Sequence, residues 1–82
     1  MTKEKIKEIV LHFLVEELEI EESKIKDEAL LKDDLGIDSL DFVDIVVIVE
    51  RNFGFKIKPE EMTDVRSLSN FYDYIESKVG TE

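Results

Sequence analysis

Two segments of this sequence carry apolar residues at the spacing of an amphipathic helix, and this pattern limits the fold more than any other feature. In the segment Lys3 to Glu19, one helical face holds Ile6, Ile9, Val10, Phe13, Leu14 and Leu18. The segment near the end repeats the pattern with Val65, Leu68, Phe71, Tyr72, Ile75 and Val79. Thr2 and Asp64 are the predicted N-caps of these helices, and Gly80 is the predicted stop of the second. Both faces must be buried, so the sequence predicts a helical domain.

The stretch from Leu40 to Phe53 has conflicting signals. Its β-branched residues favour a strand; they are Val43, Ile45, Val46, Val47, Ile48 and Val49. Its length of about fourteen residues exceeds that of most strands. Asp38 and Ser39 offer N-cap chemistry, Asp41 adds negative charge to the first turn, and Gly54 is a suitable stop. We predict a helix whose interior face is Ile45, Val46, Val49 and Phe53, with a second apolar stripe of Leu40, Val43 and Val47.

The connections between these helices differ in length. From Ile20 to Ile37 the periodicity lapses, so we predict a long loop that its own apolar residues pack down, with Gly36 in an unusual backbone geometry. Later, Pro59 to Met62 can form one short helical turn that begins at proline.

Composition limits the classes of protein to which the chain can belong. Its 82 residues, 43% of them hydrophobic, suit a single domain over residues 1–82. There is no cysteine, so disulfides and thiolate metal sites are excluded. A net charge of −10 disfavours nucleic acid and anionic membranes and favours basic partners. No apolar run approaches the ~20 residues of a membrane span, and the first residues do not resemble a signal peptide, so we expect a cytoplasmic protein.

Ser39, in the stretch Leu35 to Asp41, is the residue that we expect to be the functional centre of the protein. It has no nucleophile elbow, and its only imidazole candidate is His12 on another helix, so we predict that the chain is not an enzyme. A domain of this size also has little room for a pocket that buries a substrate. The nearby aspartates do not fit a calcium loop, because the ligand positions would fall on Leu31, Leu35 and Phe42, and we predict no metal site.

Two readings of Ser39 remain open on these grounds. The residue can be an exposed attachment point, where a phosphate-linked group would lie against the free N–H groups at the start of the helix. Alternatively, Ser39 is simply the N-cap of that helix.

The stretch Leu35-Gly36-Ile37-Asp38-Ser39-Leu40-Asp41 resembles the Asp-Ser-Leu signature of acyl carrier proteins, and the resemblance extends over essentially the whole chain. It implies an all-α fold, a small four-helix bundle of three longer helices and one short third helix, with a long first loop. It also implies a 4′-phosphopantetheine arm that a phosphopantetheinyl transferase takes from coenzyme A and joins to Ser39, with Asp38 and Leu40 framing the serine. The terminal thiol of the arm would carry acyl groups as thioesters.

The resemblance also assigns a surface for partner enzymes. Fatty acid or polyketide synthesis enzymes would contact Asp41, Asp44 and Glu50 through basic patches, beside an apolar strip of Leu40, Val43 and Val47. This strip is the second apolar stripe found above from spacing alone. Charge would steer the encounter of a monomeric carrier, and the strip would fix weak, reversible complexes.

Several residues depart from the family pattern. Phe42 is a large aromatic residue expected to be exposed beside Ser39, Arg51 and Asn52 stand where carboxylates are common, and the region Pro59 to Asp64 is short. A dedicated polyketide or specialised lipid pathway therefore stays open. The alternatives are an aminoacyl carrier of the peptidyl or D-alanyl type, and an unmodified acidic helical interaction domain.

Overall fold

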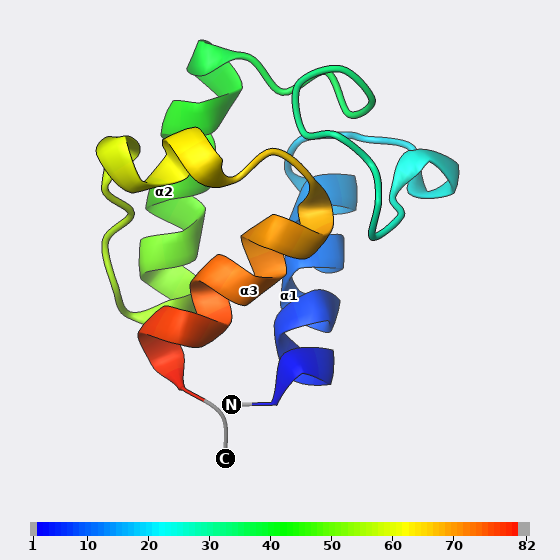
Figure 1. Cartoon of the computed structure of the whole chain (residues 1–82). Helices are drawn as coiled ribbons and strands as arrows, with labels where there is room; N and C mark the ends of the chain where they lie inside the picture. The colour runs from blue at the N-terminus through cyan, green and yellow to red at the C-terminus, as the bar shows by residue number, and fades with distance from the viewer. Residues whose placement is uncertain (1, 81–82) are drawn as a thin grey trace.

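The computed structural model describes residues 2–80, and the prediction of an all-helical domain is confirmed (Figure 1). The elements are α1 (Lys3–Glu16), the 3-10 turn η1 (Glu22–Lys24), α2 (Ser39–Phe53), the 3-10 helix η2 (Pro59–Asp64) and α3 (Leu68–Val79). η2 is the predicted short third helix, whereas η1 was not predicted. Within residues 2–80 no helix is both long and apolar enough to cross a membrane.

α1 ends at Glu16, earlier than the predicted boundary at Glu19. The backbone N–H of Leu18 donates to the carbonyl of Phe13 at 3.2 Å, and Glu19 takes a left-handed conformation with φ 56°. This turn closes the helix and keeps Leu18 partly buried against the core. An apolar residue in helical register can therefore lie beyond the end of its helix.

The start of α1 agrees with the prediction, but the predicted start of α3 is wrong. The side chain of Thr2 caps α1, as expected. α3 is capped by Ser67 rather than Asp64: the hydroxyl of Ser67 accepts from the N–H of Asn70 at 3.2 Å, and the side-chain oxygen of Asn70 accepts from the N–H of Ser67 at 3.3 Å. This reciprocal pair satisfies two backbone donors, while Asp64 is the last residue of η2.

The core lies between the three long helices and the first loop, and α1 packs against α3. On α2, Ile45 and Val49 are buried as predicted, whereas Val46 and Phe53 are half-buried at the edge of the core. Ile48 is also buried, although it was not predicted to be. The buried face of α2 belongs to the same core cluster as the buried residues of α1 and α3. Those residues are Ile6, Val10, Phe13, Leu14, Leu68, Phe71, Tyr72 and Ile75.

The first loop is packed down by its own apolar residues, as predicted; Ala29, Leu35 and Ile37 are buried. Its backbone also completes the start of α3. The N–H groups of Leu68 and Ser69 donate to the carbonyls of Ala29 and Asp27, both at 2.8 Å. Gly36 has φ 69°, the left-handed geometry expected of it. The loop is therefore a structural part of the bundle that supports the start of α3.

Candidate functional site

The start of α2 is held by the carboxylate of Asp38. Its Oδ1 atom accepts hydrogen bonds from the N–H groups of Leu40 and Asp41, each at 3.0 Å, and its backbone carbonyl accepts from Phe42 at 2.9 Å. Asp38 is thus the N-cap, and Ser39 is the first residue of the helix. The reading in which Ser39 caps α2 is wrong, because the cap position belongs to the residue before it.

This cap also corrects the expectation about a phosphate at Ser39. The N–H groups of Leu40 and Asp41 are not free, since the Asp38 carboxylate already accepts from both. A second anion would meet a helix end that is already occupied by negative charge. A phosphate bonded to Ser39 would therefore not be held by these two amides.

One face of α2 presents apolar side chains to solvent. The exposed fractions are 78% for Leu40, 60% for Val43 and 50% for Val47. These three residues form what is here called the α2 strip, and the structure confirms that it is separate from the core. Single exposed apolar residues are ordinary in folded proteins, but three along one helix face form a continuous patch.

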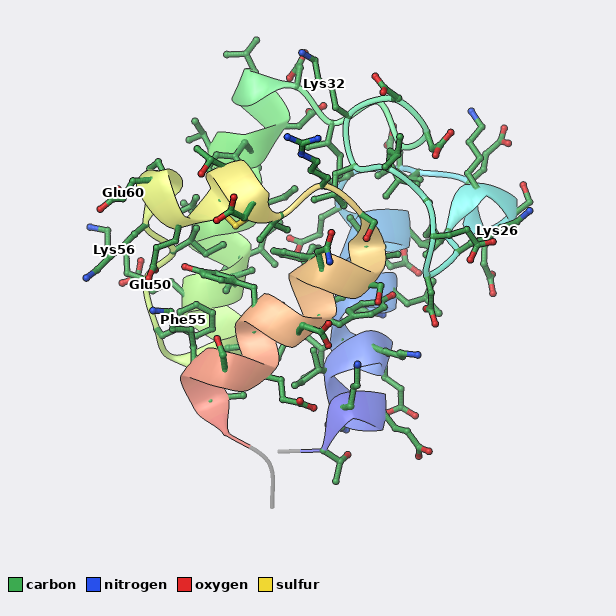
Figure 2. All side chains as sticks on the ribbon, viewed as in Figure 1. Lys26, Lys32, Glu50, Phe55, Lys56 and Glu60 are labelled. Carbon is green, nitrogen blue, oxygen red and sulfur yellow. The ribbon has the colours of Figure 1, made fainter. Side chains whose placement is uncertain are left out.

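Carboxylates accompany the α2 strip. Asp44 and Glu50 are exposed and Asp41 is half-buried, and none of the three takes part in the ion pairs found among the described residues. Figure 2 shows the Glu50 side chain beside α2 on the side of the molecule that also carries η2. Arg51, which departs from the family pattern, lies 4.0 Å from Glu17 at the end of α1. The Arg51 guanidinium is thus paired with the Glu17 carboxylate, which lies outside the α2 strip.

An open groove of about 830 Å³ lies beside the start of α2. The first loop, α2 and the η2 region share its lining, which includes Leu31, Ile37, Asp38, Phe42, Met62 and Val65. Phe42 is half-buried and packs against the core, so the expectation that it is exposed is wrong. Sequence reasoning did not foresee the groove, because its walls come from three separate segments. It is open to solvent and is not an enclosed substrate pocket.

The other candidate residue, His12, is exposed on α1. It lines a second groove of about 610 Å³ together with Glu17, Arg51 and others. Within residues 2–80, no three His, Asp or Glu side chains come together in a way that could hold a metal ion.

Comparison with known proteins first defines the class. The family model described as "Phosphopantetheine attachment site" matches residues 8–75, a range that contains the first loop, α2, η2 and most of α3. The match therefore spans every element that surrounds Ser39 and the groove. It defines a phosphopantetheine-binding carrier domain.

Two relatives narrow the class further. The chain is 38% identical to an acyl carrier protein of Thermotoga maritima over 79 residues, which are 96% of this chain and 98% of the relative. It is 35% identical to an acyl carrier protein of Coprothermobacter proteolyticus over 82 residues, the full length of both. The chain belongs to the acyl carrier protein family.

The cofactor of this family is 4′-phosphopantetheine, which supplies a terminal thiol for thioester formation. The residues present fit such a group. The start of α2 holds a serine whose neighbours Asp38 and Leu40 are both exposed, and the groove leaves open space next to them. The predicted site residues Asp38 to Asp41 are brought together on the first turn, and Val43, Asp44, Val47 and Glu50 follow on the same helix.

Proposed function

We propose that this chain carries acyl intermediates on a phosphopantetheine arm bonded to Ser39, for fatty acid or related lipid or polyketide synthesis. The observation that supports this proposal best is the cap geometry. Because Asp38 already caps α2, capping does not account for a serine at position 39. Family membership supplies the chemistry that such a serine can serve.

Attachment requires no base on this chain. The Ser39 hydroxyl oxygen would form a P–O bond to the phosphopantetheine phosphate of coenzyme A, and the phosphoanhydride bond to the nucleotide would break. The hydroxyl proton would pass to a base on the transferase. The role of this chain is to present the serine at a fixed helix start. The absence of a nucleophile elbow in the sequence around Ser39 agrees with a carrier that another enzyme modifies.

We propose the α2 strip and its carboxylates as the surface for partner enzymes. Asp41, Asp44 and Glu50 would attract basic patches, while Leu40, Val43 and Val47 would be covered in the complex. Long-range charge raises the association rate, and a small apolar contact gives complexes that dissociate readily. Both properties suit a monomeric carrier that visits several enzymes.

The test is modification followed by intact-mass measurement. Incubation with coenzyme A and a phosphopantetheinyl transferase should add one phosphopantetheine mass to the wild type. Ser39→Ala should remain unmodified, whereas Ser23→Ala, which removes a serine from the exposed turn η1, should be modified at the wild-type rate. Wild-type protein that several transferases leave unmodified would overturn the proposal.

The alternatives make different predictions. An aminoacyl carrier shares the arm, so only loading assays with acyl and amino acid ligases distinguish it. An unmodified interaction domain predicts partner binding that Ser39→Ala does not change. The names of both relatives, which are acyl carrier proteins, favour the acyl cargo.

A further inference from the structure

A cluster of three side chains joins η2 to α3. The hydroxyl of Tyr74 donates to Oε1 of Glu61 at 2.9 Å, and the Lys78 ammonium lies 3.0 Å from Oε1 and 3.1 Å from Oε2 of the same carboxylate. We call Glu61, Tyr74 and Lys78 the η2 latch. The Tyr74 oxygen also accepts from the N–H of Lys58, just before η2, at 3.4 Å.

The ring of Tyr74 in the latch also contacts an aromatic ring and a cation. The Tyr74 ring meets the Phe55 ring edge-on at a centroid distance of 6.0 Å, and the Lys78 ammonium lies 5.6 Å from the Tyr74 ring centre. Aromatic pairs of this geometry, and cations near a ring, are favourable contacts. The hydroxyl of Tyr74 is therefore held beside the Glu61 carboxylate of η2.

The latch contacts favour the ionised form of the Glu61 carboxyl. Hydrogen bonds from Lys78 and Tyr74 hold the pKa of the Glu61 carboxyl below its usual value, and the nearby Lys58 charge acts in the same direction. Glu61 is accordingly ionised and able to accept from both partners.

η2 has few other contacts to hold it in place. None of its residues is fully buried, and Met62 is its half-buried apolar contact with the core. A 3-10 helix also has poorer hydrogen-bond geometry than an α-helix. Yet Pro59, Met62 and Thr63 of this helix form one wall of the groove beside Ser39. A wall with so little burial depends on side-chain contacts for its position.

We propose that Tyr74 and Glu61 are positioning residues: the η2 latch fixes the η2 wall and so determines how firmly the groove holds an apolar chain carried by the arm. This inference rests on the proposed function of Ser39. None of the three latch residues lines the groove, so the latch would act on the cargo only through the position of η2.

The first experiment measures amide hydrogen exchange on the unmodified chain. Tyr74→Phe removes one hydroxyl and leaves the ring in place. The N–H groups of Glu61 and Val65, which bond to the carbonyls of Lys58 and Met62, should exchange about three- to ten-fold faster. Amides in the middle of α1 should be unchanged.

Two matched controls separate the latch from a general loss of charge. Glu60→Gln changes the neighbouring carboxylate, whose side chain points outward in Figure 2. Asp73→Asn breaks the exposed ion pair between Lys3 and Asp73, which joins α3 to α1. Neither should change exchange in η2. Equal exchange of these amides in Tyr74→Phe and wild type would overturn the proposal.

The second experiment uses protein loaded with an octanoyl thioester. Loading should raise the wild-type melting temperature above that of the unloaded arm-bearing form, because the chain is sheltered in the groove. In Tyr74→Phe and Lys78→Met the rise should shrink to about half or less, while Glu60→Gln should keep it. An equal rise in all four proteins would overturn the link between latch and cargo.

The two experiments also separate the possible failures. If no loaded protein forms, intact mass shows that the proposed function has failed. Hydrogen exchange on the unmodified chain still decides whether the latch positions η2.

Discussion

Single polar side chains set the starts of the helices in this molecule. Asp38, Ser67 and Thr2 each place an oxygen where the backbone N–H groups of a helix start have no partner within the helix. Thr2 was predicted as a cap from the sequence, whereas Asp38 was predicted only together with Ser39. Before α3 the predicted cap was Asp64, but the cap is Ser67, and the side chain of Asn70 accepts from its backbone N–H. Asp64 is already part of η2.

The cap of α3 provides a test at this scale. Ser67→Ala removes the side-chain acceptor of the Asn70 N–H and should lower the free energy of unfolding by about 1 kcal/mol. Asp64→Ala should change it by no more than about 0.5 kcal/mol, since Asp64 caps no α-helix. Urea unfolding followed by circular dichroism measures both. Equal losses in the two variants would contradict the assignment of the cap.

Tyr72 predicts how stability depends on alkaline pH. Burial raises the pKa of Tyr72 to about 12 from its ordinary value near 10, and the charge of Asp27 adds to the shift. The native state therefore holds a proton that the unfolded chain releases earlier. The stabilising effect is fully present below pH 10 and is lost as the pH rises towards about 12.

The measurement is the free energy of unfolding across this alkaline range. Wild-type stability should fall steadily, and Tyr72→Phe should show a shallower decline because the titrating hydroxyl is gone. Burial also raises the pKa of Tyr74, so Tyr74→Phe should make the decline shallower as well. A decline that is the same in wild type and Tyr72→Phe would show that other groups govern it.

At the scale of the element, α2 has two apolar faces with different surroundings. Ile45, Ile48 and Val49 are buried, whereas Leu40, Val43 and Val47 are exposed. Helix propensity does not explain so many β-branched residues, since these are only moderate helix formers. Packing on one face and the Asp38 cap outweigh local preference for a strand.

The two faces should respond differently to truncation. Val47→Ala should change the free energy of unfolding by no more than about 0.5 kcal/mol, because its side chain is half exposed. Ile48→Ala should lower it by about 2–5 kcal/mol, since it leaves a cavity in the core. Chemical denaturation measures both. A large loss for Val47→Ala would mean that the strip supports the fold.

Sequence reasoning was successful where one segment contains the whole signal. The face of α1, the stripe on α2, the left-handed Gly36 and the Asp-Ser-Leu stretch could all be predicted from spacing or from one motif. It failed where distant segments meet. Phe42 lines a groove that the first loop and η2 share with α2, so its burial depends on residues far away in the sequence. A local contact was also missed, because the Asp38 carboxylate already accepts from the amides of Leu40 and Asp41, which a helix start alone leaves free.

Charge acts at the scale of the whole molecule. The principal extents are 30 × 25 × 21 Å, and the net charge of −10 is spread over this small body. At 0.01 M salt the screening length is about 30 Å, so every surface carboxylate interacts with the others. At physiological ionic strength it is about 8 Å, and only near neighbours repel.

Stability should therefore rise with salt. The melting temperature should increase by several degrees, about 4–8 °C for each kcal/mol of repulsion removed, between low and physiological ionic strength. Mg²⁺ should act at lower concentration than Na⁺ because of its double charge. Differential scanning calorimetry at a series of salt concentrations makes the measurement. A melting temperature that ignores ionic strength would count against this view.

The ends of the molecule at which the helices begin and finish have a practical consequence. α1 begins and α3 finishes at one end of the molecule, while α2 begins at the other (Figure 1). A label, bead or sensor surface coupled through either terminus should leave the Ser39 end facing outward into solution. The protein can thus be immobilised for kinetic work on its modifying and loading enzymes without shielding the residue on which they act.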